Sequence, residues 1–378
     1  MKIAVNTRLL LKNKLEGIGW FTYETLIRIV NQHPEHEFYF IFDRKYDERF
    51  VFASNVTPIV IGPQARHPIL FYIWFEFSIP RVLKKIKADL FISPDAFGSL
   101  RAKTKTLTVL HDLNFEHFPN IMPPLVQKYY TYFTPKFATK ADRIATVSEF
   151  SKNDIVKQYG VSPEKVDVVY NGANKEFKPV EEDIKRITKD MYSKACDFFV
   201  FIGALNPRKN LSNLFKAFDI FKDQNTTDIK LLIVGEKMYW SGEIKDTFDA
   251  MKFKDDIIFT GRLEPEELHK VVGSALALTY VSIFEGFGIP IVEAWYSETP
   301  VITSNVTSMP EIAGDAAVIT DPFKPESIAE GLKSITFDKN LREELIEKGK
   351  KRRLEFTWQK TADNLWSSIE KTLNQTPK

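Results

Sequence analysis

The chain has few of the residues from which disulfide frameworks and metal sites are built. Its 378 residues include a single cysteine, Cys196, and six scattered histidines. One cysteine cannot form an internal disulfide, and Cys196 has no neighbours at metal-ligand spacing, which fits a reducing compartment. The histidines form no cluster with carboxylates that suggests a structural metal. We therefore expect neither disulfides nor a metal requirement.

An excess of charge of one sign is also lacking. The 52 basic and 50 acidic residues nearly cancel, leaving a net charge of +2. A protein that binds nucleic acid usually carries a strongly basic face or segment. The balance therefore argues against nucleic acid as a partner.

No apolar run in the sequence is long enough to span a bilayer. The most apolar stretch, residues 68–79, is interrupted by Glu76 and followed by Pro80. It predicts an aromatic-rich core helix, with a membrane-facing surface as the alternative. The first residues, Met1 to Val5, lead into a strand pattern without the regions of a secretory signal. We expect a cytoplasmic protein, and leave open a peripheral contact with the inner face of the membrane.

The apolar residues that are present indicate two α/β domains. A length of 378 residues exceeds what one hydrophobic core usually supports. Short apolar runs alternate with helix-length segments throughout, which is typical of parallel sheets covered on both faces. The runs of the first half are 3–5, 38–41, 90–92, 107–110 and 144–147, and those of the second half are 198–202, 231–234, 257–259, 276–280, 301–303 and 317–319.

Both halves thus resemble doubly wound, Rossmann-like parallel sheets. A polar stretch from Tyr170 to about Asp183 breaks both periodicities, and Thr357 opens an amphipathic segment with Trp366 and Ile369 on one face. We predict an N-terminal domain over residues 1–172, a second domain over 173–356, and a C-terminal helix over 357–378. Ligands of such sheets bind at the carboxyl ends of the strands.

The sharpest motif follows the strand that ends near Tyr280. It reads Phe284-Glu285-Gly286-Phe287-Gly288-Ile289-Pro290-Ile291-Val292-Glu293. The glycines permit a tight turn, and a helix N-terminus offers unpaired N–H groups to a diphosphate. Glu285 and Glu293 flank this turn, and carboxylates accept hydrogen bonds from vicinal sugar hydroxyls. The alternative is that Glu293 complements the helix dipole and Glu285 is a solvated loop residue.

A basic loop leaves the first strand of the second half. Gly203 ends that strand, and Arg208 and Lys209 follow in the same loop. Two cations at this edge could neutralise a diphosphate leaving group, on which negative charge builds during glycosyl transfer. The alternative is a solvated basic loop. Arg262 and Leu263 end another strand of this half, where backbone groups could contact a nucleobase.

Two weaker motifs lie in the first half. Gly17 and Gly19 follow the first strand, so their amides could approach phosphate or acceptor, although the third glycine of a dinucleotide fingerprint is missing. His111 directly follows the strand 107–110 and is aimed at the same strand edge, unless it is a satisfied core histidine beside a capping Asp112. Ser148 is expected to cap the next helix.

Taken together, these motifs resemble the family-4 retaining glycosyltransferases of the GT-B fold, in particular bacterial transferases of surface-polysaccharide assembly. The most specific element is the pair Glu285 and Glu293, seven residues between them. It is supported in order by the loop 17–19, by 111–113, by 171–172, by 207–210 and by 308–315.

The resemblance implies two facing domains, a last helix that crosses back to the first domain, and catalysis without a bound metal. It further implies that Glu293 holds the donor ribose, Glu285 contacts the donor hexose, Arg208 and Lys209 bind the diphosphate, and His111 faces the sugar. One departure is that Ala204 follows Gly203 where many members carry arginine, so that Arg208 would replace the missing cation.

We therefore expect a retaining hexosyltransferase that uses a nucleotide diphosphate sugar, GDP- or UDP-linked, with a weak preference for GDP-mannose. The acceptor would be a glycan or a lipid-linked glycan. The rivals are a nucleotide-sugar epimerase of the same architecture and a non-catalytic nucleotide-sugar binding protein. A nicotinamide dehydrogenase is disfavoured by the incomplete glycine fingerprint.

Overall fold

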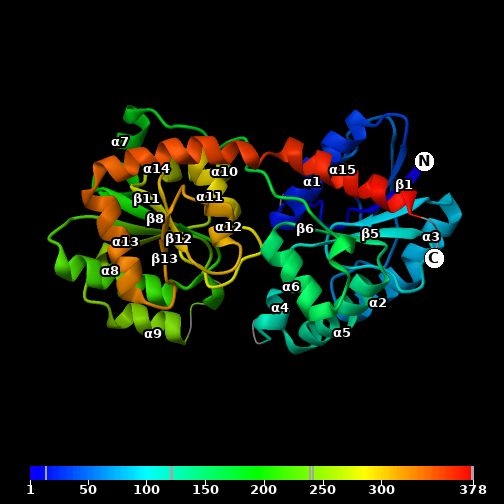
Figure 1. Cartoon of the computed structure of the whole chain (residues 1–378), viewed down its shortest axis with the longest axis horizontal. Coiled ribbons are helices and arrows are strands. Elements are labelled where there is room, and N and C mark those ends of the chain that lie inside the picture. Colours follow the sequence, from blue (N-terminus) through cyan, green and yellow to red (C-terminus); the bar gives the residue numbers. More distant parts are fainter. Residues whose placement is uncertain (13–14, 120–121, 238–239, 241, 376–378) are drawn as a thin grey trace. The chain divides into compact units, whose positions relative to one another are not determined.

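The computed structural model of the chain consists of two compact units (Figure 1). Unit 1 comprises Met1–Asn171 together with Trp358–Lys378, and unit 2 comprises Gly172–Thr357. The structure describes residues 1–12, 15–119, 122–237, 240 and 242–375. Within these ranges, no helix is both long and apolar enough to cross a bilayer.

Unit 1 is built on a seven-stranded parallel sheet with the order β3-β2-β1-β4-β5-β6-β7. Its strands are β1 (Lys2–Asn6), β2 (Glu37–Phe42), β3 (Val56–Val60), β4 (Leu90–Ser93), β5 (Lys105–Leu110), β6 (Arg143–Thr146) and β7 (Val166–Val168). The chain leaves β1 toward β2 on one side, whereas β4 lies on the other side. Such a reversal opens a crevice at the carboxyl ends of the two central strands, which here are β1 and β4.

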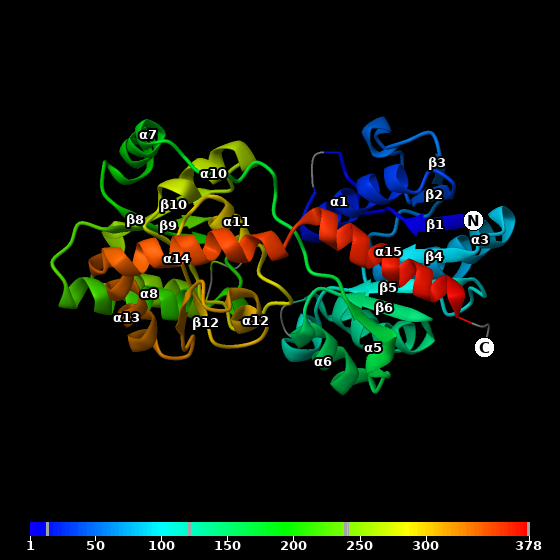
Figure 2. The same cartoon turned by 45° about the horizontal axis from the view of Figure 1, so that its top comes forward.

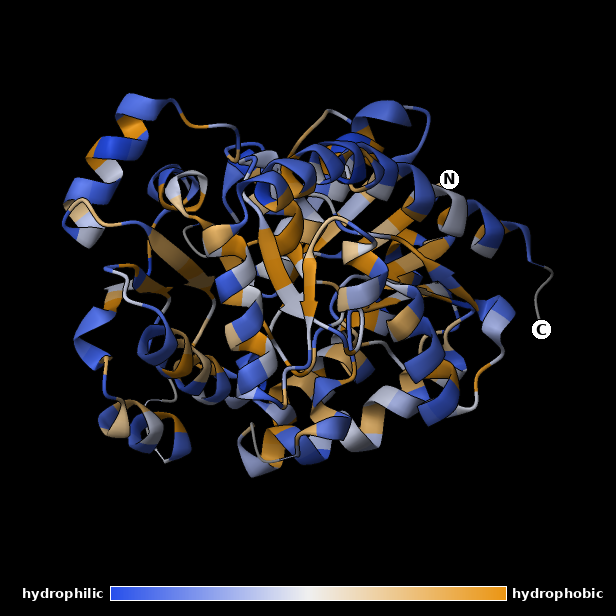
Figure 3. Ribbon diagram, turned by 60° about the vertical axis from the view of Figure 1, so that its left-hand side comes forward, coloured by the Kyte–Doolittle hydropathy of each residue, from blue (hydrophilic) through white to orange (hydrophobic). Residues whose placement is uncertain are grey.

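Helices cover both faces of this sheet, and their hydrophobic sides build its cores. They are α1 (Gly17–Gln32), α2 (Pro68–Ile73), the π-helix η2 (Trp74–Ser78), α3 (Ile79–Ile86), α4 (Asn114–His117), α5 (Pro124–Lys140), α6 (Glu149–Tyr159) and α15 (Trp358–Asn374), with short 3₁₀ turns at Glu48–Phe50 and Pro163–Lys165. Figure 3 shows that the strands are the most hydrophobic ribbons and that the helices alternate along their length.

The C-terminal helix α15 belongs to unit 1 and lies beside α1 (Figure 2). It buries Leu365 and Ile369, and the ring of Trp366 stacks on His33 at 3.5 Å. Lys105 Nζ donates to the carbonyls of Leu373 and Gln375, both at 2.6 Å, and so satisfies acceptors at the end of the helix. The segment after Thr357 is thereby an integral layer of unit 1.

Unit 2 repeats the architecture with a six-stranded parallel sheet of order β10-β9-β8-β11-β12-β13. Its strands are β8 (Phe198–Ile202), β9 (Lys230–Val234), β10 (Ile257–Gly261), β11 (Ala277–Tyr280), β12 (Val301–Ser304) and β13 (Val318–Thr320). Its helices are α7 (Glu182–Ser193), α8 (Leu211–Gln224), α9 (Glu243–Ala250), α10 (Pro265–Ser274), α11 (Ile289–Tyr296), α12 (Met309–Ala313), α13 (Pro325–Phe337) and α14 (Lys339–Arg352), with 3₁₀ turns at Pro207–Lys209, Lys254–Asp256 and Arg353–Glu355. The reversal of order falls between β8 and β11, which carry the basic loop and the Glu285 motif.

The prediction of two doubly wound parallel sheets is confirmed, and all six strands of the second half lie where the apolar runs place them. The sequence reading missed β3 and β7 of unit 1. Strand β3 contains Pro58 and is an edge strand, where a proline lacking its N–H is tolerated. Strand β7 has three residues, of which Asp167 forms an ion pair with Arg143. Neither strand therefore shows an uninterrupted apolar run.

Candidate functional site

The carboxyl edge of the unit 2 sheet is shaped by glycines that follow β8 and β9. Gly203 N donates to the carbonyl of Val234, and Gly235 N donates to that of Gly261. A Cβ atom on Gly235 would lie 2.0 Å from the Gly203 carbonyl oxygen, so no other residue fits without displacing backbone. The segments after β8 and β9 therefore approach each other closely at this edge.

The Glu285 motif forms a buried loop that leads into α11. Gly288 precedes the helix with φ of 103°, a conformation that favours glycine. Ser308 Oγ, fully buried, donates to the carbonyls of Glu285 and Phe287 at 2.9 and 3.1 Å. The Phe287 ring packs edge-on against Phe356. These contacts hold the backbone of 285–288 in front of the N-terminus of α11, where the helix dipole favours an anion.

Glu285 is the centre of a buried charge cluster. Its Oε1 lies 2.9 Å from Arg208 Nη1 and 2.6 Å from Lys209 Nζ. Burial disfavours the carboxylate, but the charges of Lys209 and Arg208 outweigh that effect and bring the pKa of Glu285 down to about 2. The alternative of a solvated loop residue is therefore wrong for Glu285.

The loop that supplies the two cations is fixed to neighbouring elements. Arg208 Nη1 also donates to the Phe284 carbonyl at 3.0 Å. Asn210 adopts a left-handed conformation, and its Nδ2 donates to the carbonyls of Val281 and Pro322. Lys209 Nζ donates to the Tyr280 hydroxyl at 2.6 Å, and burial raises the pKa of this phenol well above its usual value. Tyr280 was not singled out in the sequence because it reads as a strand residue.

Glu293 lies in the second turn of α11 and is half-buried. Burial raises the pKa of its carboxyl to about 7, although a hydrogen bond from the Asn174 backbone N–H favours the charged form. The carboxyl therefore changes charge near neutral pH. The pKa of Glu293 in the folded chain is higher than the ordinary value of 4.5. The protonated carboxyl therefore contributes its full stability to the fold below pH 4.5, and this contribution is lost as pH rises through about 7.

This titration predicts a pH dependence of nucleotide binding. If Glu293 accepts hydrogen bonds from ribose hydroxyls, its ionised form binds more strongly. The dissociation constant of the bound nucleotide should fall as pH rises from 6 to 8, by up to about tenfold per unit on the acidic side of the pKa. Titration calorimetry across this range measures it. In Glu293→Gln the constant should be higher and independent of pH, and an unchanged profile in that variant would exclude the assignment.

The remaining predicted residues of unit 2 lie at the same edge. Arg262 is exposed and Leu263 half-buried in the loop after β10. Gly286 is buried in the motif loop, and Ile289 begins α11. Their assignment to nucleotide binding stays a prediction.

His111 lies at the carboxyl end of β5 in unit 1. Its Nε2 is 2.9 Å from the Pro94 carbonyl, which can only accept, so Nε2 bears a proton. Burial lowers the pKa of the imidazole, and the neutral ring then has its lone pair on Nδ1. The ring packs edge-on against Phe21 at 4.9 Å. The histidine is thus half-buried against Phe21 and held in one tautomer.

The other predicted features of unit 1 are local. Helix α1 begins at Gly17, so the two glycines occupy its first turn, and a Cβ atom on Gly19 would come within 3.1 Å of the Leu9 carbonyl oxygen. Asp112 Oδ1 accepts from Asn114 N, as a cap does. The prediction that Ser148 caps α6 is confirmed by a 3.0 Å bond from Ser151 N to its hydroxyl.

A buried ion pair that was not predicted from the sequence lies next to the turn that contacts His111. Arg8 Nε lies 2.5 Å from Asp95 Oδ2, and both side chains are buried. Asp95 Oδ1 also accepts from Asn6 Nδ2 at 2.8 Å. The pair joins the chain after β1 to the turn after β4, across the point where the strand order reverses. Pro94, whose carbonyl orients His111, is the neighbour of Asp95.

The Arg8 guanidinium is enclosed by aromatic rings. Its Cζ lies 4.9 Å from the ring centre of Phe97, with Phe71 and Phe75 nearby. Ala96, next to Asp95, adopts φ of 69°, which is strained for a residue with a Cβ atom. The surroundings therefore impose the shape of this turn.

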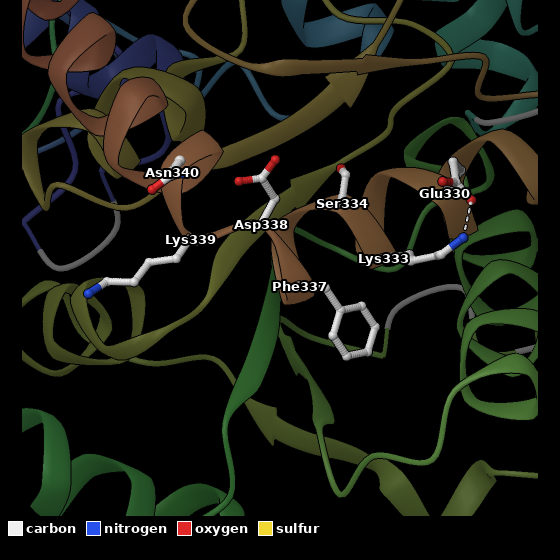
Figure 4. Close-up of a pocket in the computed structure, with 7 residues that line it drawn as sticks. All are labelled: Glu330, Lys333, Ser334, Phe337, Asp338, Lys339 and Asn340. Carbon is white, nitrogen blue, oxygen red and sulfur yellow. Dashed lines mark hydrogen bonds and ion pairs between the residues drawn. The ribbon is translucent and has the colours of Figure 1, made fainter.

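A separate hollow of about 540 Å³ lies where α13 meets α14 (Figure 4). It is lined by Glu330, Lys333, Ser334, Phe337, Asp338, Lys339 and Asn340. Glu330 and Lys333 pair with each other at 3.4 Å, and none of the lining residues follows a strand of the sheet. The hollow is a groove between two helix ends and is separate from the site described above. Among the residues that the structure describes, no group of three His, Cys, Asp or Glu side chains is arranged to hold a metal ion.

Comparison with known proteins defines the class of this molecule. Residues 16–177 match the model of Glycosyltransferase Family 4, and residues 189–352 match that of Glycosyl transferases group 1. The chain is 28% identical over 295 residues to the O-antigen chain mannosyltransferase RfbU of Salmonella typhimurium, covering 77% of this chain and 78% of that one. It is 25% identical over 371 residues to O-antigen chain mannosyltransferase B of Escherichia coli, covering 95% and 97%.

Solved structures agree on the fold. The Anabaena Alr3699/HepE protein in complex with UDP-glucose superposes with a TM-score of 0.74 at 17% identity, covering 98% of this chain and all of that one. WaaG, a glycosyltransferase involved in lipopolysaccharide biosynthesis, superposes with a TM-score of 0.70 over 98% of both chains. The protein is a glycosyltransferase of the GT-B fold. It belongs to glycosyltransferase family 4 through its first half and to glycosyl transferases group 1 through its second.

Proposed function

We propose that this glycosyltransferase moves a hexosyl group, mannose from GDP-mannose in the first instance, to a glycan or lipid-linked glycan of a surface polysaccharide, with retention of configuration. The mannose preference is supported by the two O-antigen chain mannosyltransferases among its relatives. The observation that supports the donor site most strongly is the buried cluster of Glu285, Arg208 and Lys209 at the loop that leads into α11.

The cluster suits the charge changes of the reaction. As the bond between the sugar C1 and the phosphate oxygen breaks, negative charge develops on that oxygen. Arg208 and Lys209, already fixed by Phe284 and Tyr280, stabilise this charge without reorganising. The acceptor hydroxyl forms the new bond to C1, and its proton passes to the departing phosphate oxygen, so that the nucleotide diphosphate leaves.

Each carboxylate has a distinct task in this scheme. Glu285 stays ionised at any working pH and accepts hydrogen bonds from hydroxyls of the transferred sugar. Glu293 accepts from the ribose. Because the two side-chain cations supply the positive charge that the diphosphate requires, we propose that transfer needs no metal ion and no other cofactor. His111, held as the Nε2–H tautomer, would contribute an acceptor at Nδ1.

We place the reaction at the cytoplasmic face of the membrane, where lipid-linked acceptors and nucleotide sugars meet. The test is to incubate the protein with GDP-mannose and, in parallel, UDP-glucose, with a lipid-linked acceptor fraction, and to measure nucleotide diphosphate release and the anomeric signal of the product by NMR. Transfer with retention supports the proposal. Conversion of the donor sugar without transfer would instead indicate an epimerase, and binding without release a non-catalytic protein.

A further inference from the structure

Unit 1 exposes a group of large apolar side chains on α2 and α5. Ile69 is 60% exposed, Tyr132 58% and Leu125 49%, and Tyr72 and Ile73 lie beside them. The segment 68–79 was predicted to be a core helix, and it fills the core with Phe71, Trp74 and Phe75, but its other side faces solvent. Side chains of this size gain by leaving water, so a patch of them marks an interaction surface.

Ring contacts connect the exposed side chains of the two helices, which are neighbours in Figure 1. The Tyr72 ring, on α2, lies 5.8 Å from that of Phe133, on α5. Phe133 in turn contacts Tyr132, and Tyr72 lies 6.0 Å from Phe77 in η2. We call this surface the aromatic patch; it comprises Ile69, Tyr72, Ile73, Phe77, Leu125, Tyr132 and Phe133.

The chain around the aromatic patch is almost free of acidic residues. Residues 64–88 contain five arginines and lysines and one acid, Glu76, which is buried and accepts a bond from Leu100 N. Residues 122–140 contain three lysines and no acid. A chain with a net charge of only +2 thus has an excess of positive charge in the two segments that form this surface.

Several of these cations lie directly over the rings. Lys136 Nζ is 3.2 Å from the centre of the Tyr132 ring, and the guanidinium of Arg101 is 4.2 Å from that of Phe77. The guanidinium of Arg81 lies 5.9 Å from the centre of the same ring. Aromatic rings that bear a polar group settle at the level of lipid headgroups, where neighbouring lysines and arginines meet anionic phosphates.

We propose that the aromatic patch docks unit 1 on the surface of an anionic lipid membrane. This inference deepens the proposed function and rests on it, since a lipid-linked acceptor is presented at such a surface. Exposed aliphatic residues and tyrosines beside a cationic, acid-free rim fit a lipid surface. Such a surface buries the apolar side chains, and its anionic headgroups pair with the lysines and arginines.

The experiment is sedimentation of the full chain with vesicles of phosphatidylcholine alone or mixed with phosphatidylglycerol. The protein should sediment with the mixed vesicles and much less with the neutral ones, and salt should weaken binding. Ile69→Ser combined with Leu125→Ser and Tyr132→Ser should abolish sedimentation. Arg81→Gln combined with Lys128→Gln and Lys136→Gln should weaken it by about fivefold per cation.

A matched control lies on α7 of unit 2, where Ile184, Ile187 and Met191 are also exposed, but where three acids balance three bases. The three serine substitutions there should leave sedimentation unchanged. Nucleotide diphosphate release is measured for every variant without vesicles, in the presence of donor and of the detergent-solubilised acceptor fraction, and should not change in the patch variants. Absence of release from the unaltered chain would refute the proposed function instead.

The docking proposal is overturned if the unaltered chain releases nucleotide but does not sediment with anionic vesicles. It is equally overturned if the patch variant sediments as well as the unaltered chain. Self-association that depends on the aromatic patch, in place of vesicle binding, would assign the surface to a second copy of the chain.

Discussion

Glu285→Gln should lower kcat by about 10²–10³-fold, the usual cost of removing one preorganised group that stabilises a transition state. The substitution keeps the shape of the side chain but removes the charge that Arg208 and Lys209 share. Without this carboxylate, the positive charges of Arg208 and Lys209 are no longer neutralised by a neighbour. Binding of free nucleotide diphosphate should therefore persist. Steady-state kinetics and calorimetry on the same preparations separate the two effects.

The substitution also has a cost in folding stability. A pKa of about 2, below the ordinary 4.5, means that Glu285 contributes stability above pH 4.5 that is lost as pH falls through about 2. Its loss should reduce the free energy of unfolding of unit 2 by about 3 kcal/mol at neutral pH. Glu298→Gln is the control, since Glu298 follows the same helix and pairs with Lys350 in a less buried setting. Full activity in Glu285→Gln would refute the catalytic assignment.

Arg8→Met should destabilise unit 1 by about 3–5 kcal/mol, because it leaves Asp95 buried without its counter-ion. Methionine can fill much of the space among Phe71, Phe75 and Phe97. The loss of stability therefore arises mainly from the missing positive charge and less from a cavity. Hydrogen exchange of amides in β1 and β4 measures the opening of unit 1 separately from that of unit 2. Turnover should fall as well, since the turn that contains Pro94 orients His111.

The control for this prediction is Arg28→Met, which breaks a partly exposed pair with Glu24 one turn away on α1. Pairs of this kind within one helix contribute about 0.3–0.5 kcal/mol, so this variant should behave almost as the unaltered chain. The double variant Arg8→Met with Asp95→Asn should recover part of the lost stability, because it removes the uncompensated charge. Equal destabilisation by Arg8→Met and Arg28→Met would contradict the role of the buried pair.

The sequence predicted the donor half of the site better than its supporting groups. The residues of the 203–209 loop and of the 284–293 motif are close together in the sequence. Each segment has glycine and charged residues directly after a predicted strand, so both could be recognised without the structure. Arg8 and Asp95 are 87 residues apart and meet only because β1 and β4 pair. Tyr280 looks like any aromatic strand residue until the fold brings Lys209 to its hydroxyl. Contacts between distant residues leave no local pattern.

The fold shows the same division. Strands buried on both faces, such as β8 and β11, are continuous apolar runs and were predicted, whereas the edge strands β3 and β7 have polar or proline positions. The segment 68–79 indicated a core helix, and its aromatic content hid a second, solvent-facing side. A hydrophobic pattern in the sequence shows which residues are apolar. Whether each of them is buried depends on the elements that pack against it, which the pattern does not show.

The central claim is that the donor binds at the carboxyl edge of β8 and β11 in unit 2. Hydrogen–deuterium exchange of the full chain with and without saturating GDP-mannose or UDP-glucose tests it most directly. We predict that one of these donors slows exchange of the amides in 203–210 and 285–293, and that Glu293→Gln weakens this protection. Protection confined to the groove between α13 and α14, or turnover of a donor without slower exchange in these two loops, would contradict the account.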